Sequence, residues 1–129
     1  MQFSTLYVTA FIAGSIGAVV GAFAGGFIAG AQCDGGLECL EAAFLGIGIG
    51  GIVGESLVMA VAVHVANQRQ GNLLLSFIPT ALLAFPMVGV LIMGVTAVLA
   101  LPLFLFQAWV CVKVQLATGN RKTRAGRRA

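Results

Sequence analysis

The sequence predicts an all-α, polytopic membrane protein with four transmembrane helices in two antiparallel hairpins and both termini in the cytoplasm. Hydrophobic residues make up 60% of the 129 residues and charged residues only 9%, too few to cover the surface of a soluble domain. Apolar stretches of about 20 residues, the length that crosses the hydrocarbon core as a helix, recur along the chain. The basic residues all fall in segments that four helices would place on one side of the membrane.

Two apolar stretches separated by a polar connector occupy the first half of the chain. The first span is predicted from residue 5 to 30 and the second from residue 42 to 66. The connector, residues 31–41, holds acidic residues and no basic one. The N-terminal segment Met1–Ser4 lacks the positive region of a signal peptide, so we expect the first span to be retained.

The second half carries no charge between residues 73 and 112. A single helix over these roughly 40 residues would be about 60 Å long, twice the thickness of the hydrocarbon core. The chain therefore has to turn, and we place the turn between residues 89 and 96. This predicts a third span from residue 73 to 93 and a fourth from residue 95 to 114. Alternatively, Pro102 marks a re-entrant break.

Basic residues in short loops mark the cytoplasmic side of a membrane protein. Four spans place the loop that contains Arg69 on the same side as the C-terminal tail, which holds five of the seven basic residues. Residues 1–116 are thus predicted to form one transmembrane domain and residues 117–129 a disordered, basic cytoplasmic tail. We expect the membrane to be a bacterial inner membrane or an equivalent energy-transducing membrane.

Glycine and alanine recur on one face of each of the first two spans. In lipid, such small residues let two helices approach closely and gain dispersion contacts. Either the two spans pack against each other as an antiparallel pair, or the glycine face binds a partner subunit. The glycines predicted to pack helices are Gly14, Gly17, Gly21, Gly25, Gly46, Gly50 and Gly54.

Glu55 is the one charged residue between Glu41 and Arg69, near the middle of the second span. Inserting a charged residue at that depth costs about 2.5–3.5 kcal/mol on insertion scales, so an intramembrane acid indicates function. We expect an isolated carboxyl group there to be neutral and to donate a hydrogen bond. It could pin the helix to a neighbouring carbonyl or polar side chain, or it could bind and release H⁺ or Na⁺, for instance in a ring of copies. The polar side chains considered for such a pin are Ser15, Ser76, Thr80 and Gln107.

The segment Gly46–Gly51 together with Glu55 resembles the glycine-rich helix and mid-membrane acid of the proteolipid ring subunits of rotary ATPases. In that family the glycine repeat and the acid lie on successive helices, with a polar turn between them. Here both lie on one helix, and the polar segment Arg69-Gln70 follows the acid. The resemblance covers these residues alone and does not assign the chain to the family.

His64, Cys33 and Cys39 are the remaining candidates for a site. His64 follows Glu55 by nine positions, a rotation of about 900°, so the two side chains leave the helix on opposite sides. We expect His64 to reach the headgroup region; it could ligate a haem or chlorin, but no second ligand or attachment motif accompanies it. Cys33 and Cys39 flank a Gly-Gly turn and could form a disulfide in an oxidising compartment, whereas two thiols alone make an incomplete metal site.

The sequence offers no nucleophile paired with a base and no metal cluster, so we expect no enzymatic activity, no metal and no cofactor. The favoured hypothesis is a small membrane subunit that packs through its glycine faces to scaffold or stabilise a larger complex. The alternatives are a homo-oligomeric ion or proton channel or carrier that uses Glu55, and a pigment- or lipid-binding module. The expected partners are the lipid bilayer and other membrane subunits or copies of the chain itself, and not nucleic acid.

Overall fold

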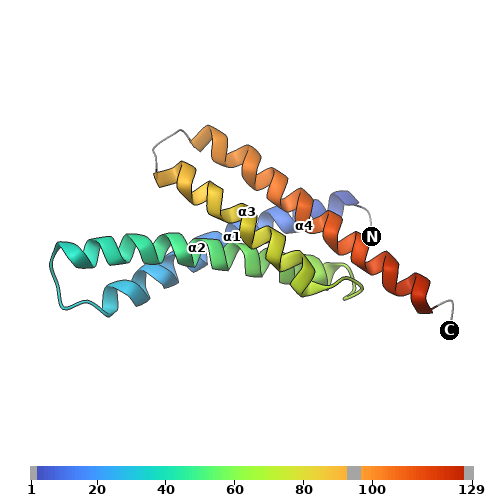
Figure 1. The fold of residues 1–129 in the computed structure, drawn as a ribbon, viewed down its shortest axis with the longest axis horizontal. Coiled ribbons are helices and arrows are strands. Elements are labelled where there is room, and N and C mark those ends of the chain that lie inside the picture. Colours follow the sequence, from blue (N-terminus) through green and yellow to red (C-terminus); the bar gives the residue numbers. More distant parts are fainter. Residues whose placement is uncertain (1–2, 93–96, 127–129) are drawn as a thin grey trace.

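The computed structural model describes residues 3–92 and 97–126, with side chains at residues 3–86 and 101–119. These residues form four α-helices and no strand (Figure 1). The helices are α1 (Phe3–Ala31), α2 (Leu37–Ala66), α3 (Leu73–Ile92) and α4 (Ala97–Gly126). The prediction of an all-helical chain is confirmed.

Three helical segments within the described residues are long and apolar enough to cross a membrane: α1, α2 and Leu101–Gly119 of α4. This agrees with the prediction of an integral membrane protein. The apolar segment described in α3, Leu73–Pro86, is shorter than a span, so the fourth crossing stays a prediction. The turn expected between the third and fourth spans falls on residues 93–96, which lie outside the described residues.

The start of α2 differs from the predicted start of the second span. The helix begins at Leu37 rather than at residue 42, directly after Gly35 and Gly36, whose φ angles of 108° and 99° suit glycine and reverse the chain. Glu38 stands in the first turn, where a negative charge favours the amino end of a helix. Glu38 and Glu41 of the connector are therefore helical, whereas Asp34 precedes the helix.

The end of α4 also differs from the prediction. The helix continues to Gly126, so the backbone of most of the segment 117–129 is helical where we predicted disorder. This segment is rich in arginine, lysine and alanine, which favour helices, and it contains no proline. At its other end α4 is continuous through Pro102. The alternative of a re-entrant break at Pro102 is therefore wrong.

Glycines bring the backbones of α1 and α2 into contact. A Cβ atom built on Gly21 would stand 2.9 Å from the Cα atom of Gly54, and one built on Gly54 would stand 2.8 Å from the Cα atom of Gly21. Cβ atoms do not approach other atoms that closely, so this part of the contact requires glycine on both helices. The facing positions are Gly17 with Gly54, Gly21 with Gly50 and Gly25 with Gly46. Their reversed order makes α1 and α2 antiparallel neighbours within one chain.

The pair formed by α3 and α4 crosses the pair formed by α1 and α2 (Figure 1). The two pairs meet near the end of the molecule that carries the start of α1, and they diverge toward the connector between α1 and α2. The buried apolar core lies where they meet. It consists of residues of α1, α2 and α4: Leu6, Ala10, Met59, Val63, Phe104, Ala108, Cys111 and Val112.

Gly14 differs from the other glycines predicted to pack helices. A Cβ atom built on it would meet the side chains of Met59 and Phe104 instead of a helix backbone. The space that Gly14 leaves open is thus filled by this core, close to the place where α4 joins α1 and α2.

Candidate functional site

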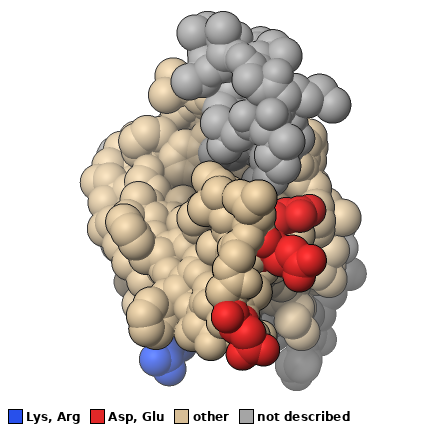
Figure 2. Space-filling view, turned by 90° about the vertical axis from the view of Figure 1, so that its left-hand side faces the viewer, with Lys and Arg blue, Asp and Glu red and all other residues tan. Residues whose placement is uncertain are grey.

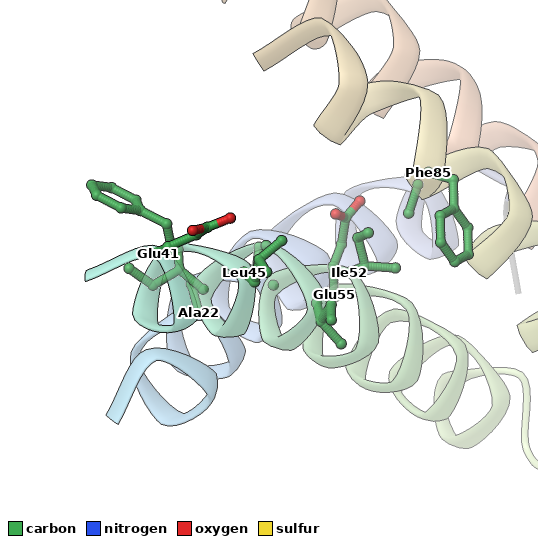
Figure 3. A pocket seen from close by; sticks show the side chains of 13 residues that line it. Ala22, Glu41, Leu45, Ile52, Glu55 and Phe85 are labelled. Atoms are coloured by element: carbon green, nitrogen blue, oxygen red, sulfur yellow. The ribbon is translucent and has the colours of Figure 1, made fainter. Parts of the chain in front are cut away.

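The Glu55 carboxyl group is buried where the two helix pairs begin to diverge. Only 3% of the residue is exposed, and its Oε1 atom has no hydrogen-bond partner among the described residues. Figure 3 shows the side chain directed away from α2 and into the space beside α3. An unsatisfied buried acceptor costs about 1–3 kcal/mol, so packing alone gives no reason for an acid at this position.

A groove of about 820 Å³ extends from Glu55 along α2. Ala18, Ala22, Gly48 and Gly51 make it hollow, because their small side chains leave the space between the helix pairs open. Its other walls are mostly large apolar side chains, among them Phe44, Leu45, Ile49, Ile52 and Phe85. The groove is therefore an apolar channel in the protein surface with an acid at its inner end.

Glu41 is the second acid that lines the groove. It lies on the same helix as Glu55, roughly 14 residues or about 21 Å nearer to the connector, and it is exposed. Figure 3 shows the two carboxyl groups at different positions along α2. A cation that enters along α2 would pass Glu41 before it reaches Glu55.

Gln107 of α4 is the polar side chain that approaches the Glu55 carboxyl group. Its Nε2 donates to the Thr80 carbonyl oxygen at 3.0 Å, while its Oε1 has no partner within the described parts of the chain. A protonated Glu55 could donate to this oxygen, which would satisfy an acceptor on each side chain. An ionised Glu55 could instead accept from the Gln107 amide, and its Oε1 atom would still need a cation or a further donor. Ser15, also considered as a partner, donates to the Phe11 carbonyl oxygen at 2.9 Å.

A row of buried polar side chains continues from Gln107 along the contact between α3 and α4. The row consists of Gln107, Thr80, Cys111, Ser76 and Gln115, all of them fully buried. Gln115 Nε2 donates to Ser76 Oγ at 2.8 Å. Beyond it, the Asn72 N–H donates to Thr118 Oγ1 at 3.1 Å, beside the loop between α2 and α3. Polar groups thus lead from Glu55 to the side of the molecule opposite the groove.

His64 is not part of the groove. It is half-buried on α2, and its Nδ1 atom has no partner in the portion of the chain that the structure describes. Over the same portion, no group of three or more His, Cys, Asp or Glu side chains could hold a metal ion. The role of His64 in binding a pigment stays a hypothesis.

Cys33 and Cys39 lie together at the connector, and both are free thiols in the structure. The Gly35 N–H donates to Cys39 Sγ at 3.2 Å. A hydrogen bond with Cys39 is the main reason that the pKa of the Cys33 thiol is raised, with smaller contributions from burial and from the charge of Cys39. The two sulfur atoms are thus neighbours, and the disulfide between them stays a prediction.

No family model matches this chain, and neither a curated protein nor a solved structure matches it. What the site can do must therefore follow from the chemistry of its own residues.

Gln107, Thr80 and Ser76 were among the partners considered for Glu55, whereas the row that they form with Cys111 and Gln115, and the groove, were not predicted. The row had a visible signal, because Gln107, Cys111 and Gln115 recur at every fourth position, as do Ser76 and Thr80. That spacing puts each set on one face of its helix. The groove had no such signal, because it depends on the angle at which the two helix pairs diverge.

Proposed function

We propose that this protein is a multi-pass membrane protein that binds and releases a cation at Glu55 and so acts as a carrier or channel. The observation that carries the proposal is a carboxyl group that is almost fully buried, has an unpartnered oxygen, and lies at the inner end of an open groove. An acid in the membrane interior is costly. This cost is offset when the Glu55 carboxylate binds a cation.

A purely structural role explains Glu55 less well. A residue that pins helices would have both carboxyl oxygens in hydrogen bonds, yet Oε1 has no partner among the described residues. The contact between α3 and α4 has its own hydrogen bonds, from Gln107 to Thr80 and from Gln115 to Ser76. The interaction of Glu55 with Gln107 of α4 leaves Oε1 without a partner, and the carboxyl group lines the groove.

Transport requires that the cation reach Glu55 from one side of the membrane and leave it toward the other. The groove and the polar row lie on opposite sides of Glu55 and support such a path. The groove reaches Glu55 from the end with the acidic connector. The polar row leaves the site in the opposite direction, toward the loop that contains Arg69. In the proposed topology of four crossings in two hairpins, that loop and both termini are cytoplasmic, and the groove opens on the other side of a bacterial inner membrane or an equivalent one. Each chain has one carboxyl group at this depth, so copies that assemble would bring several together.

The test is ion flux through the purified protein in liposomes. Glu55→Gln keeps the size of the side chain and removes its charge, so we expect the flux of H⁺ or another cation to be lost. Glu41→Gln is the matched control, because it removes an exposed acid of the same groove and should leave most of the flux. A Glu55→Gln protein that conducts like the wild type would overturn the proposal.

A second candidate is the scaffolding subunit of a larger membrane complex. The glycines that suggested it face one another inside the chain, so a partner would have to use other surfaces. The surface open to such a partner is a row of exposed apolar side chains on α1, which would otherwise face lipid: Ile12, Ile16, Val19, Val20, Phe23 and Phe27. Purification in mild detergent separates the candidates, because foreign subunits support the scaffold, a homogeneous oligomer supports the carrier, and a coloured band supports a pigment-binding module.

A further inference from the structure

The walls of the groove narrow the kind of cation that Glu55 can accept. Na⁺ and other hard cations need several oxygen ligands. Around Glu55 the described residues supply its own carboxyl group and the Gln107 amide, and the other residues that line the groove near it are apolar. A small inorganic ion would also leave most of the roughly 820 Å³ without a contact.

The same walls suit a larger organic molecule. Pockets for such ligands occupy about 300–1,000 Å³ and are lined mainly by apolar and aromatic side chains with a few polar groups that set orientation. The groove has this size and composition. Phe44 and Phe85 line it, and each residue is 64% exposed, so their rings are accessible to a ligand.

The charge of the ligand follows from the charges of the groove. Glu41 and Glu55 are its ionisable side chains, and no lysine or arginine lines it in the described chain. Figure 2 shows acidic side chains gathered on the end of the molecule that holds the connector, where Asp34, Glu38 and Glu41 are all exposed. A surface of one sign concentrates ligands of the opposite sign at its entrance.

We propose that the groove binds an amphiphilic organic cation, with its apolar body between α2 and α3 and its positive charge at the Glu55 carboxylate. The apolar body gains by leaving water or the interface for the walls of the groove. The aromatic rings of Phe44 and Phe85 add cation–π attraction where the charge passes them. This proposal names the ligand class and rests on the proposed function, in which Glu55 binds and releases a cation.

The test uses tetraphenylphosphonium as the probe and tetraphenylborate as a control of the same shape and opposite charge. Binding of each is measured by equilibrium dialysis against the full-length protein in detergent, with protein-free micelles of the same detergent as the background for partition. We expect saturable binding of the phosphonium alone and a loss of more than about tenfold in affinity with Glu55→Gln. Glu55→Asp, which keeps the charge, should lose less, so a folding defect can be told apart from the loss of the carboxylate.

A second pair of variants tests the position of the ligand. Phe85→Ala removes a groove wall and should weaken phosphonium binding by about three- to tenfold. Phe27→Ala is the matched control, because Phe27 is exposed on α1 and does not line this groove; it should bind the probe as the wild type does. Equal effects of the two substitutions would overturn the proposed place of the ligand.

The outcomes distinguish the ligand class from the function. If neither ion binds saturably, or both bind alike, the organic-cation proposal is wrong, and Glu55-dependent flux of H⁺ or Na⁺ would still uphold the carrier or channel. If the phosphonium binds through Glu55 but neither it nor any inorganic cation crosses a liposome membrane, the ligand class stands and the transport function falls.

Discussion

Gly21 and Gly50 touch so closely that a Cβ atom built on either would overlap the carbonyl oxygen of the other. The next residue along α2 is different. A Cβ atom on Gly51 would have the Ala18 carbonyl oxygen at 3.7 Å and the Ala22 Cβ at 3.8 Å as its nearest neighbours, which are ordinary contacts. Two adjacent glycines of one helix thus differ in whether the fold can accept a methyl group.

Gly50→Ala should therefore destabilise the protein, and Gly51→Ala should not. Overpacking a tight contact typically costs about 1–3 kcal/mol, whereas replacing a helical glycine by alanine in open space contributes up to about 1 kcal/mol of helix stability. Thermal unfolding followed by circular dichroism in detergent measures both variants. Equal shifts in Tm would show that α1 and α2 do not meet through Gly21 and Gly50.

Gly71 should be coupled to Gln115. A Cβ atom on Gly71 would overlap Gln115 Oε1 and lie 2.8 Å from Gln115 Cδ, so Gly71→Ala must displace the side chain whose Nε2 donates to Ser76. We expect Gly71→Ala to cost about 1–3 kcal/mol in the wild type and clearly less in a Gln115→Ala protein, which lacks those atoms. A double-mutant cycle on unfolding free energies measures the coupling. Additive effects would contradict the contact.

Cys33 should react slowly with alkylating reagents for as long as Cys39 is present. The hydrogen bond with Cys39 favours the protonated Cys33 thiol and raises its pKa, so less of the reactive thiolate is present at a given pH below that pKa. Cys39→Ala removes the hydrogen-bonding side chain, so Cys33 should be alkylated faster in this variant at pH 8. Cys39→Ser keeps a hydrogen-bonding side chain, so it should increase the rate less. Mass spectrometry after timed reaction with iodoacetamide gives the rates. An unchanged rate in the Cys39→Ala protein would show that Cys39 is not the cause.

The side of the membrane that the connector faces can be tested with the same cysteines. In the proposed topology the connector lies opposite the loop that contains Arg69, because basic residues mark the cytoplasmic side. A membrane-impermeant maleimide should therefore label Cys33 and Cys39 in right-side-out vesicles and a cysteine introduced at Gln68 in inverted ones. Labelling of all three cysteines from one side would show that α2 does not cross the membrane between Cys39 and residue 68.

The sequence was a good guide to the helical class and to the glycine contact between α1 and α2, one of its two alternatives, and a poor guide to the groove that three helices form. The helical class follows from composition and was predicted correctly, and three of the four predicted spans have helices of membrane length among the described residues. The start of α2 was missed because Glu38 and Glu41 look like loop residues, although the glycine turn before them allows the helix to begin earlier. The groove was missed because its walls come from α1, α2 and α3 together.

Glu55→Gln should leave the protein at least as stable as the wild type, although Glu55 is almost fully buried. A glutamine amide can donate to Gln107 Oε1, which has no partner among the described side chains, and it carries no charge that must be desolvated. We expect an unchanged Tm or a gain of about 1 kcal/mol, the pattern of a residue kept for activity at some cost in stability. Glu55→Leu separates the loss of the charge from the gain of a hydrogen bond. Leucine also carries no charge, but it leaves Gln107 Oε1 without a donor. If Glu55→Gln instead destabilised the protein by several kcal/mol, the carboxyl group would be a structural hydrogen-bonding group, and its place in the groove would need another explanation.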